Sequence, residues 1–374
     1  MNVVASSPEG LEKLLAKEVS DVGGKQIKIF KRSVSFECDL ATFYRIHFYS
    51  RIAFRFYREV SRFPCSDKKS LYKFVQSSFD WMKWLPPNKS FCVQVTGKNL
   101  FLRHSHFTAL QVKNAIIDLQ KKYSGSRSAI SIKNPYIIIH LHINNEEAIL
   151  SLQSTVESLH KRGYRPFMSN APLKENLAAG LIQLTEWEGK KPLIDIMCGS
   201  GTLLIEAVSQ YLRVPNLTKK NYLFENWIDF RKDIFTSEKL KLLNNDLSDL
   251  QISKVIGCEI DIDIFKQAQK NISLAGLENY VELHNMDFSS LIINEEPGII
   301  LCNPPYGKRI GAEQELIDLY SQLGDFLKKN CSGWTLWLLS GNPKLTKFLK
   351  MKASLKIPIN NGGLDCRWIK YLIN

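Results

Sequence analysis

The feature that most constrains the fold of this chain is an alternation of apolar, strand-like runs with helical segments, which begins at Lys191. The runs cover residues 192–197, 254–259, 280–284, 298–302 and 334–339. Such alternation is typical of a parallel sheet with crossover helices on its faces. Two last runs, 352–357 and 366–373, flank a loop of Pro, Asn and Gly and predict an antiparallel hairpin that closes the sheet. We therefore expect an α/β domain here.

The first part of the chain mixes short helices and short strands less regularly. Helical spacing covers residues 10–19, 40–51 and 107–123, and strand-like patterns cover residues 25–36, 91–97 and 136–143. Short elements of both kinds predict small α+β units. We place the boundary between two such units near residues 62–70.

The net charge of +13 comes entirely from this first part. Residues 1–170 contain 26 Lys and Arg against 13 Asp and Glu, whereas residues 171–374 contain 24 of each. A basic region beside a neutral one indicates a module that binds a polyanion, joined to a second module. A solvated basic surface without a partner remains the alternative on charge alone.

Cysteine usage and hydropathy exclude several classes of protein. The eight cysteines are dispersed and form no C-x-x-C pair, which argues against a disulfide framework or a zinc knuckle. No apolar run reaches the roughly 18 residues of a membrane span, and the chain start shows no secretory signal. His140 and His142 share a strand face, but zinc needs more ligands than this pair. We expect a cytoplasmic protein with no metal, no membrane contact and no protein partner.

A glycine-containing loop follows the strand-like run that ends in Asp195. Gly199 and Gly201 let the backbone turn sharply and approach a ligand closely before a helix over residues 203–211. The loop lacks the Lys of a P-loop and the third glycine of the dinucleotide fingerprint. A short Gly-x-Gly after an acidic strand end suits a nucleoside with a cationic tail.

Two further acids follow strand-like runs. Glu259 is placed to accept hydrogen bonds from both ribose hydroxyls, and Asp287 from an adenine amino group. Either acid alone is better interpreted as a surface carboxylate near a turn. Three acids at successive strand ends, on the ligand-binding face of an α/β sheet, together predict a nucleoside site.

The most specific feature is the loop Asn303-Pro304-Pro305-Tyr306-Gly307, which follows an apolar strand. The two prolines remove backbone donors and leave carbonyl acceptors. The Asn303 amide oxygen and the Pro304 carbonyl are suited to accept both hydrogens of one planar exocyclic amine. Such contacts favour the attacking geometry of the nitrogen and stabilise developing positive charge. Tyr306 offers a ring for stacking an extruded base.

At these motifs the sequence resembles class I S-adenosylmethionine-dependent methyltransferases, and within them the THUMP-containing RNA guanine-N2 methyltransferases that act on large-subunit ribosomal RNA. The resemblance is carried by residues 106–122, 158–165, 171–179, 199–202, 303–307 and 363–366. It implies four parts: a ferredoxin-like domain (1–60), a THUMP RNA-binding domain (61–150), a linker (151–170) and a Rossmann-like methyltransferase domain (171–374). It also implies N2-methylation of a guanine in ribosomal RNA, by in-line displacement and without a dedicated general base.

The resemblance also implies roles for individual residues. The family pattern places S-adenosylmethionine against Lys174, Asn176, Asp195, Cys198, Gly199, Gly201, Thr202, Glu259 and Asp287. The target guanine is held by Asn303, Pro304, Pro305 and Tyr306. Phosphates of the RNA are expected at Lys161, Arg162, Arg165, Lys308 and Arg309. A solvated linker is the alternative for the first three of these cations.

The sequence departs from the family pattern in three places. Ile196 stands where the family usually has proline, and residues 153–157 lack the usual Asp, Ser and Gly, yet neither change removes a contacting group. Some bacterial members continue into a second methyltransferase domain. Since this sequence ends at Asn374, we expect no second activity.

Other functions remain open at this point. The same chemistry on transfer RNA is the first alternative, because the motifs do not separate the two substrates. Methylation of adenine N6 or of a protein glutamine is another, since the loop at Asn303 serves any planar amine. A third is an RNA-binding or ribosome-assembly protein with a silent methyltransferase domain.

Overall fold

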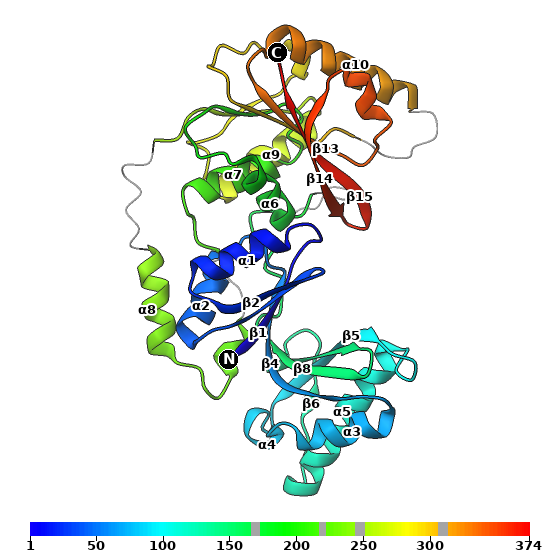
Figure 1. The fold of residues 1–374 in the computed structure, drawn as a ribbon. Helices are drawn as coiled ribbons and strands as arrows, with labels where there is room; N and C mark the ends of the chain where they lie inside the picture. The colour runs from blue at the N-terminus through cyan, green and yellow to red at the C-terminus, as the bar shows by residue number, and fades with distance from the viewer. Residues whose placement is uncertain (166–172, 217–221, 244–250, 306–312) are drawn as a thin grey trace. The chain divides into compact units, whose positions relative to one another are not determined.

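The computed structural model describes residues 1–165, 173–216, 222–243, 251–305 and 313–374. Its contacts divide the chain into two units (Figure 1). The first comprises Met1–Ser7, Leu15–Leu159 and Leu217–Leu243. The second comprises Pro8–Leu14, His160–Asn216 and Asn244–Asn374. Each unit is described by itself below.

Among the described residues, the first unit is built on an eight-stranded sheet in the order β2-β3-β1-β4-β8-β7-β5-β6. The strands are β1 (Asn2–Ser6), β2 (Lys25–Phe30), β3 (Ser33–Glu37), β4 (Arg55–Pro64), β5 (Ser90–Lys98), β6 (Ala129–Ile130), β7 (Ile137–Asn144) and β8 (Glu147–Gln153). The helices are α1 (Glu12–Asp21, most of which lies in this unit), α2 (Leu40–Tyr49), α3 (Lys68–Ser77), α4 (Trp81–Trp84), α5 (Ser105–Ser124), α8 (Lys232–Leu243) and the 3-10 turn η1 (Leu223–Asn226).

Strand β4 makes this sheet continuous across the boundary expected near residues 62–70. Val3 of β1 pairs with Arg58, and on the other side of β4 Tyr57 pairs with Gln153 of β8. One ten-residue strand thus serves both halves of the sheet, so the sheet is continuous across the boundary that we predict from the sequence. At the start of the expected linker 151–170, β8 continues to Gln153.

The single strand expected over residues 25–36 is two strands. β2 and β3 pair antiparallel, with Phe30 opposite Ser33. Arg32 in the turn between them has a φ of 62°, a left-handed conformation that reverses the chain. The predicted helices over 40–51 and 107–123 correspond to α2 and α5.

Residues 222–243 fold with the first unit, although they lie inside the expected methyltransferase range 171–374. The physical reason is an aromatic cluster: Phe43 and Tyr44 of α2 pack against Phe224, at centroid distances of 5.6 and 5.2 Å. Arg45 pairs with Glu238 at 2.6 Å, so this insertion is fixed by charge as well as by apolar contact.

The second unit contains a seven-stranded sheet among the residues described, in the order β11-β10-β9-β12-β13-β15-β14. The strands are β9 (Leu193–Asp195), β10 (Val255–Cys258), β11 (Glu282–His284), β12 (Ile299–Cys302), β13 (Thr335–Ser340), β14 (Ala353–Asn361) and β15 (Leu364–Leu372). The helices are α6 (Glu175–Thr185), α7 (Thr202–Tyr211), α9 (Ile262–Leu274) and α10 (Glu313–Asn330), with 3-10 turns η2 (Phe288–Ser290) and η3 (Leu345–Leu349). The predicted parallel sheet and its antiparallel hairpin of β14 and β15 are confirmed.

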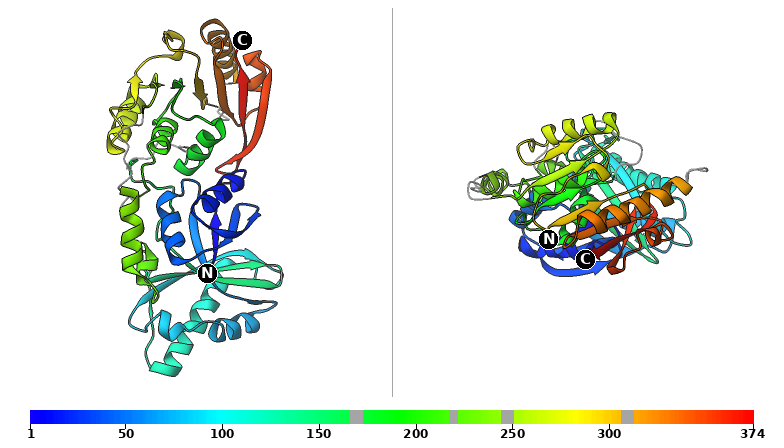
Figure 2. Two further views of the ribbon diagram at one scale, coloured as in Figure 1. Left: turned by 60° about the vertical axis from the view of Figure 1, so that its left-hand side comes forward. Right: turned by 90° about the horizontal axis from the view of Figure 1, so that it is seen from above.

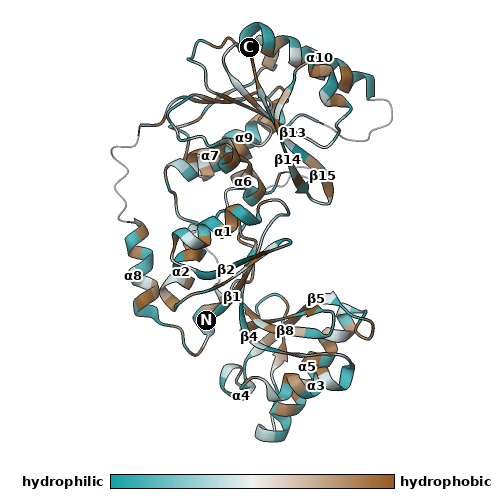
Figure 3. Cartoon of the chain, in the orientation of Figure 1, coloured by the Kyte–Doolittle hydropathy of each residue, from teal (hydrophilic) through white to brown (hydrophobic). Residues whose placement is uncertain are grey.

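Helices cover both faces of this second sheet. On one face Ile194 and Ile300 lie in one buried cluster with Tyr320 and Leu323 of α10. On the other face the Trp368 indole donates to the Leu181 carbonyl of α6 at 3.1 Å. Figure 2 gives two further views of these layers, and Figure 3 shows that α10 carries both hydrophobic and hydrophilic residues. None of the helices in the described parts of the chain is both long and apolar enough to cross a membrane.

Candidate active site

The strand order of the second unit creates a switch point at β9. The chain runs from β9 to β10 and β11 on one side, and then returns to β12 on the other side. Asp195, the last residue of β9, lies level with Gly257 of β10 and Leu301 of β12. Two residues beyond these positions come Glu259 and Asn303, at the same carboxyl edge of the sheet. Ligands of open α/β sheets bind in the crevice at this point.

The glycine loop leaves β9 at this edge and enters α7. Gly199 and Gly201 have φ values of 55° and 77°, in the left-handed region that favours glycine. The loop is anchored because the Cys198 amide donates to the Cys258 carbonyl at 2.9 Å. The Asn271 side chain donates to the Ser200 carbonyl at 3.0 Å. Gly201 is the N-cap of α7, so Thr202 is the first helical residue.

Glu259 joins the glycine loop to the loop that follows β10. Its Oε2 accepts from the Gly199 amide at 3.0 Å, and its Oε1 accepts from the Asp261 amide at 2.9 Å. Each carboxylate oxygen can accept a second hydrogen bond. The carboxylate therefore lies directly beside the glycine loop with acceptor capacity left for a ligand hydroxyl.

Asp287 has a local structural role. Its Oδ1 accepts from the amide of Ser289 at 2.9 Å and from the Ser289 hydroxyl, and it caps η2. Ser289 thus engages one carboxylate oxygen, which the sequence did not indicate. A contact of Asp287 with an adenine amino group stays a prediction.

Asp195 is almost fully buried, at 1% exposure. Its Oδ1 accepts from the Met197 amide at 3.4 Å. Burial raises the pKa of Asp195 to about 7, and the charge of Glu259 adds to the effect. A buried acid beside the glycine loop favours a ligand that brings a positive charge.

Arg165 holds the start of α6 against the start of α7. Its Nη1 donates to the Leu173 carbonyl at 2.9 Å and to the Thr202 hydroxyl at 3.0 Å. Its Nη2 pairs with Glu175 Oε1 at 3.1 Å, and both side chains are more than nine-tenths buried. The prediction that Arg165 grips an RNA phosphate is therefore wrong, because its donors are used inside the domain.

Arg162 requires the same correction. Its Nε and Nη2 donate to the two carboxylate oxygens of Glu206 on α7, at 2.9 and 3.2 Å. The Tyr164 hydroxyl donates to the same carboxylate at 3.0 Å. The guanidinium side chain is 5% exposed and Glu206 is fully buried, so this pair cannot meet RNA without breaking. Lys161, by contrast, is exposed.

The start of α6 brings a set of polar residues to this network. Lys174 is the N-cap residue and is exposed, whereas Glu175 and Asn176 are buried. The family resemblance places the segment 174–176 over the cofactor, and from it we selected Lys174 and Asn176; Tyr164 and Glu206 received no role from the sequence. The signal for Glu206 was available: a lone acid within the apolar run Thr202–Val208 must find a partner when that run is buried.

Asn303 directly follows β12 at the switch point. Its Oδ1 is buried, and it accepts no hydrogen bond from any part of the chain that the structure describes. Pro304 is buried and Pro305 is exposed. Since buried polar atoms normally have partners, this acceptor indicates a site that a ligand donor completes. Tyr306, Lys308 and Arg309 lie outside the described residues.

Three family models match this chain in order. The RlmL ferredoxin-like domain matches residues 2–57, the THUMP domain residues 65–153, and the RMKL-like methyltransferase domain residues 162–370. The chain belongs to the RMKL-like methyltransferase family. The resemblance and the fold class predicted from the sequence are thereby confirmed.

Curated relatives agree with this membership. A "Putative RNA methyltransferase" of Synechocystis is 38% identical over 98% of this chain and 95% of its own length. The "Ribosomal RNA large subunit methyltransferase K/L" of Vibrio parahaemolyticus is 36% identical over 99% of this chain. The chain spans about half the length of that relative, 53%.

Solved structures show the same fold. A "putative methyltransferase complexed with SAH" is 26% identical, with a TM-score of 0.89 over 100% of this chain and 98% of its own. A "predicted N6-adenine-specific DNA methylase" of Listeria monocytogenes is also 26% identical, with a TM-score of 0.87 over 100% of this chain and 96% of its own.

S-adenosylmethionine is the methyl donor of this family member, and the residues at the switch point fit it. The glycine loop gives close backbone approach, Glu259 has acceptor capacity beside it, and buried acids suit a cationic group. Space is also available, since a Cβ at Gly199 would meet no atom within 4 Å. When bound, the cofactor supplies an electrophilic methyl group on a sulfonium.

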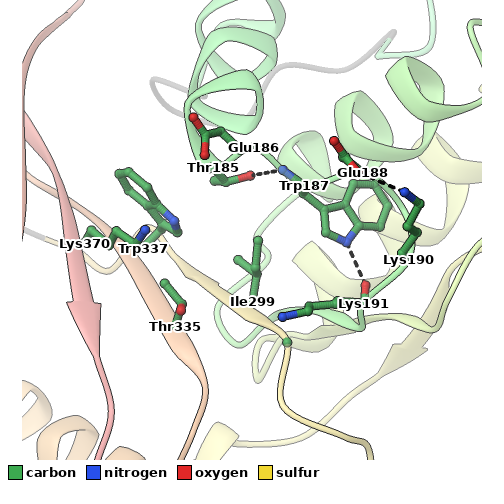
Figure 4. A pocket seen from close by; sticks show the side chains of 11 residues that line it. Thr185, Glu186, Trp187, Glu188, Lys190, Lys191, Ile299, Thr335, Trp337 and Lys370 are labelled. Atoms are coloured by element: carbon green, nitrogen blue, oxygen red, sulfur yellow. Dashed lines mark hydrogen bonds and ion pairs between the residues drawn. The ribbon is translucent and has the colours of Figure 1, made fainter.

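A separate hollow of about 290 Å³ lies at the opposite, amino edge of the sheet (Figure 4). Gly298 precedes β12 and Thr335 begins β13, so the hollow cannot be the switch-point site. Several of its polar groups pair with one another: the Trp187 indole donates to the Lys191 carbonyl at 2.7 Å, and Glu188 pairs with Lys190. Within the described ranges, no group of three or more His, Cys, Asp or Glu side chains could hold a metal ion.

Proposed function

We propose that this protein transfers methyl from S-adenosylmethionine to the exocyclic N2 amine of a guanine in large-subunit ribosomal RNA, in the cytoplasm. The observation that carries the proposal is the buried, unsatisfied Asn303 Oδ1 at the switch point. An acceptor left open at that edge suits a donor with two N–H bonds, and an exocyclic base amine is such a donor.

The chemistry required of the protein is positioning. The lone pair of an exocyclic amine is delocalised into its ring, so the amine is a weak nucleophile. Asn303 and the carbonyl of Pro304 direct its two N–H bonds toward acceptors, which favours attack along the free axis and stabilises positive charge on the nitrogen. The surplus proton leaves after transfer, so no residue has to act as a base during attack.

RNA as the substrate is supported by three observations. The THUMP model matches residues 65–153, the curated relatives carry RNA methyltransferase names, and the excess positive charge lies in residues 1–170. Ribosomal RNA is preferred over transfer RNA because the Vibrio relative is named for the large subunit. A silent domain is disfavoured because the glycine loop and Glu259 are intact and in place.

The loop after β5 offers a surface for unpaired bases in the first unit. Asn99 Oδ1 accepts from the amides of Phe101 and Leu102 at 3.0 and 2.8 Å, which fixes a turn. The turn exposes Leu100 by 74% and Phe101 by 63%. In the same unit, Lys68 Nζ lies 4.4 Å from the ring centre of Phe107. Aromatic rings among cations are the combination that binds single-stranded nucleic acid.

The substitution Asn303→Ala tests the catalytic part of the proposal. We expect turnover to fall by about a hundred- to a thousand-fold, the scale on which one electrostatic contact in a transition state is lost. The affinity for S-adenosylhomocysteine, measured by calorimetry, should stay within about twofold, and Asn294→Ala on an exposed loop should change neither value. Loss of cofactor affinity in Asn303→Ala, or unchanged turnover, would contradict the assigned role.

A further inference from the structure

We propose that Glu175 is a cofactor-binding residue that accepts a hydrogen bond from the amino group of the methionyl end of S-adenosylmethionine. The inference rests on S-adenosylmethionine as the donor, and it is independent of which base is methylated.

The first observation is an open acceptor on a buried acid. Glu175 is 4% exposed, and its Oε1 is paired with Arg165 at 3.1 Å. Its Oε2 is buried, and no donor from the described residues reaches it. An unpartnered carboxylate oxygen inside a protein is costly, and it therefore indicates that a donor completes the site.

The second observation is where this oxygen lies. The same Arg165 guanidinium that holds Glu175 donates through Nη1 to the Thr202 hydroxyl at 3.0 Å. Thr202 is the first residue of α7 and follows Gly201 of the glycine loop. Because one guanidinium bridges the two side chains, the Glu175 carboxylate lies within a few ångströms of the loop that receives the cofactor.

The chemistry of the donor follows from charge. Arg165 already neutralises one carboxylate oxygen, and burial still raises the pKa of Glu175. A hydrogen-bond donor at Oε2 offsets this cost of burial, and a cationic donor offsets it most. The methionyl end of the cofactor carries an ammonium group, which has three N–H donors. Glu259 contacts the glycine loop at Gly199, whereas Glu175 is linked through Arg165 to Thr202 after the loop, so the two acids can bind different ends of one ligand.

Glu175→Gln tests this assignment by calorimetry with two ligands and no RNA. S-adenosylhomocysteine has the amino-acid end, and 5′-methylthioadenosine lacks it. We expect Glu175→Gln to weaken S-adenosylhomocysteine by about ten- to a hundred-fold, the range for a hydrogen bond to a charged group. The affinity for 5′-methylthioadenosine should not change. Glu188→Gln, at an exposed ion pair just beyond α6, is the matched control and should leave both affinities unchanged.

A purely structural role of Glu175 gives a different result. If it acts only by holding Arg165 and the start of α7, both ligands lose affinity to the same extent, and that result overturns the proposal. Equal affinities in the variant and the wild type would also overturn it.

A second comparison uses the wild-type protein and so does not depend on the variant folding. A derivative of S-adenosylhomocysteine with hydrogen in place of its amino group should bind about ten- to a hundred-fold more weakly than the parent. In a soluble Glu175→Gln protein this difference should disappear, as a double-mutant cycle requires for two groups in contact. A wild type that does not discriminate between the two compounds would contradict the contact.

Discussion

At the scale of single residues, the motif positions divide into those that face the site and those that hold it together. Glu259 and Asn303 present acceptors at the carboxyl edge of the sheet. Arg162 and Arg165 have all the features of phosphate-binding residues in the sequence, yet both are buried in ion pairs. A sequence pattern identifies a cation but does not say which way its side chain points.

The raised pKa of Asp195 predicts a pH dependence of cofactor binding. At pH 6 the buried carboxyl is mostly protonated, because its pKa is about 7, and at pH 8 it is mostly ionised. A ligand that brings an ammonium group near this carboxyl prefers its ionised form, so the affinity for S-adenosylhomocysteine should rise with pH across this window and protons should be released on binding.

Calorimetry at several pH values, in buffers of different ionisation enthalpy, measures the affinity and the number of protons released on binding. Asp195→Asn serves as the reference, because it keeps the titration of the ligand and removes that of the carboxyl. Proton uptake by the wild type, or the same pH profile in both proteins, would contradict the assignment.

At the scale of elements, the buried pair of Arg162 and Glu206 attaches the segment before α6 to α7. Arg162→Met removes the cation that balances the buried charge of Glu206, which should cost about 3–5 kcal/mol of the free energy of unfolding. Urea denaturation measures this loss. The exposed neighbour substitution Lys161→Met should change stability by no more than about 0.5 kcal/mol.

The same two variants separate structure from RNA binding. Arg162→Met should leave the salt dependence of RNA affinity unchanged, whereas loss of a phosphate contact at Lys161 should lower the salt slope by about 1. A stable Arg162→Met protein with weaker RNA binding would contradict this expectation and would support Arg162 as a residue that binds an RNA phosphate.

The exposed turn after β5 predicts a stacking contact. Phe101→Ala should weaken binding of a single-stranded RNA by about 1–3 kcal/mol, with no change in salt slope, because stacking releases no counterions. Fluorescence anisotropy at several salt concentrations measures both values. Ile292→Ala removes an apolar side chain of the second unit that is even more exposed, 79% against 63%, and should have no effect. Equal affinities of the two variants would exclude a role for Phe101.

Element patterns were predictable where hydrophobic periodicity was strong. The parallel strands β9, β10, β12 and β13 and the hairpin of β14 and β15 follow from apolar runs and turn residues alone. The long strand β4 and the insertion at residues 222–243 did not. Their placement depends on partners distant in sequence, such as Tyr44 and Phe224, which no local pattern connects.

At the scale of the whole molecule, the two compact units do not follow the order of the matched domains along the chain. The part matched by the RMKL-like methyltransferase model contains residues that complete the core of the first unit. Changes of texture and charge in the sequence separate a basic first part from an α/β second part, whereas the ferredoxin-like and THUMP domains are implied by the family resemblance. No sequence pattern indicates that residues 222–243 pack with the first unit, because this packing depends on which surfaces are apolar after folding.

For the whole protein, we propose methylation of guanine N2 in ribosomal RNA. Its most direct test uses labelled S-adenosylmethionine with unmodified, protein-free large-subunit ribosomal RNA and, separately, with bulk transfer RNA. The products are digested to nucleosides and identified by mass spectrometry. We expect labelled N2-methylguanosine from the ribosomal RNA alone. The same nucleoside from transfer RNA alone would contradict the substrate, and labelled methyladenosine would contradict the amine assigned to the loop at Asn303.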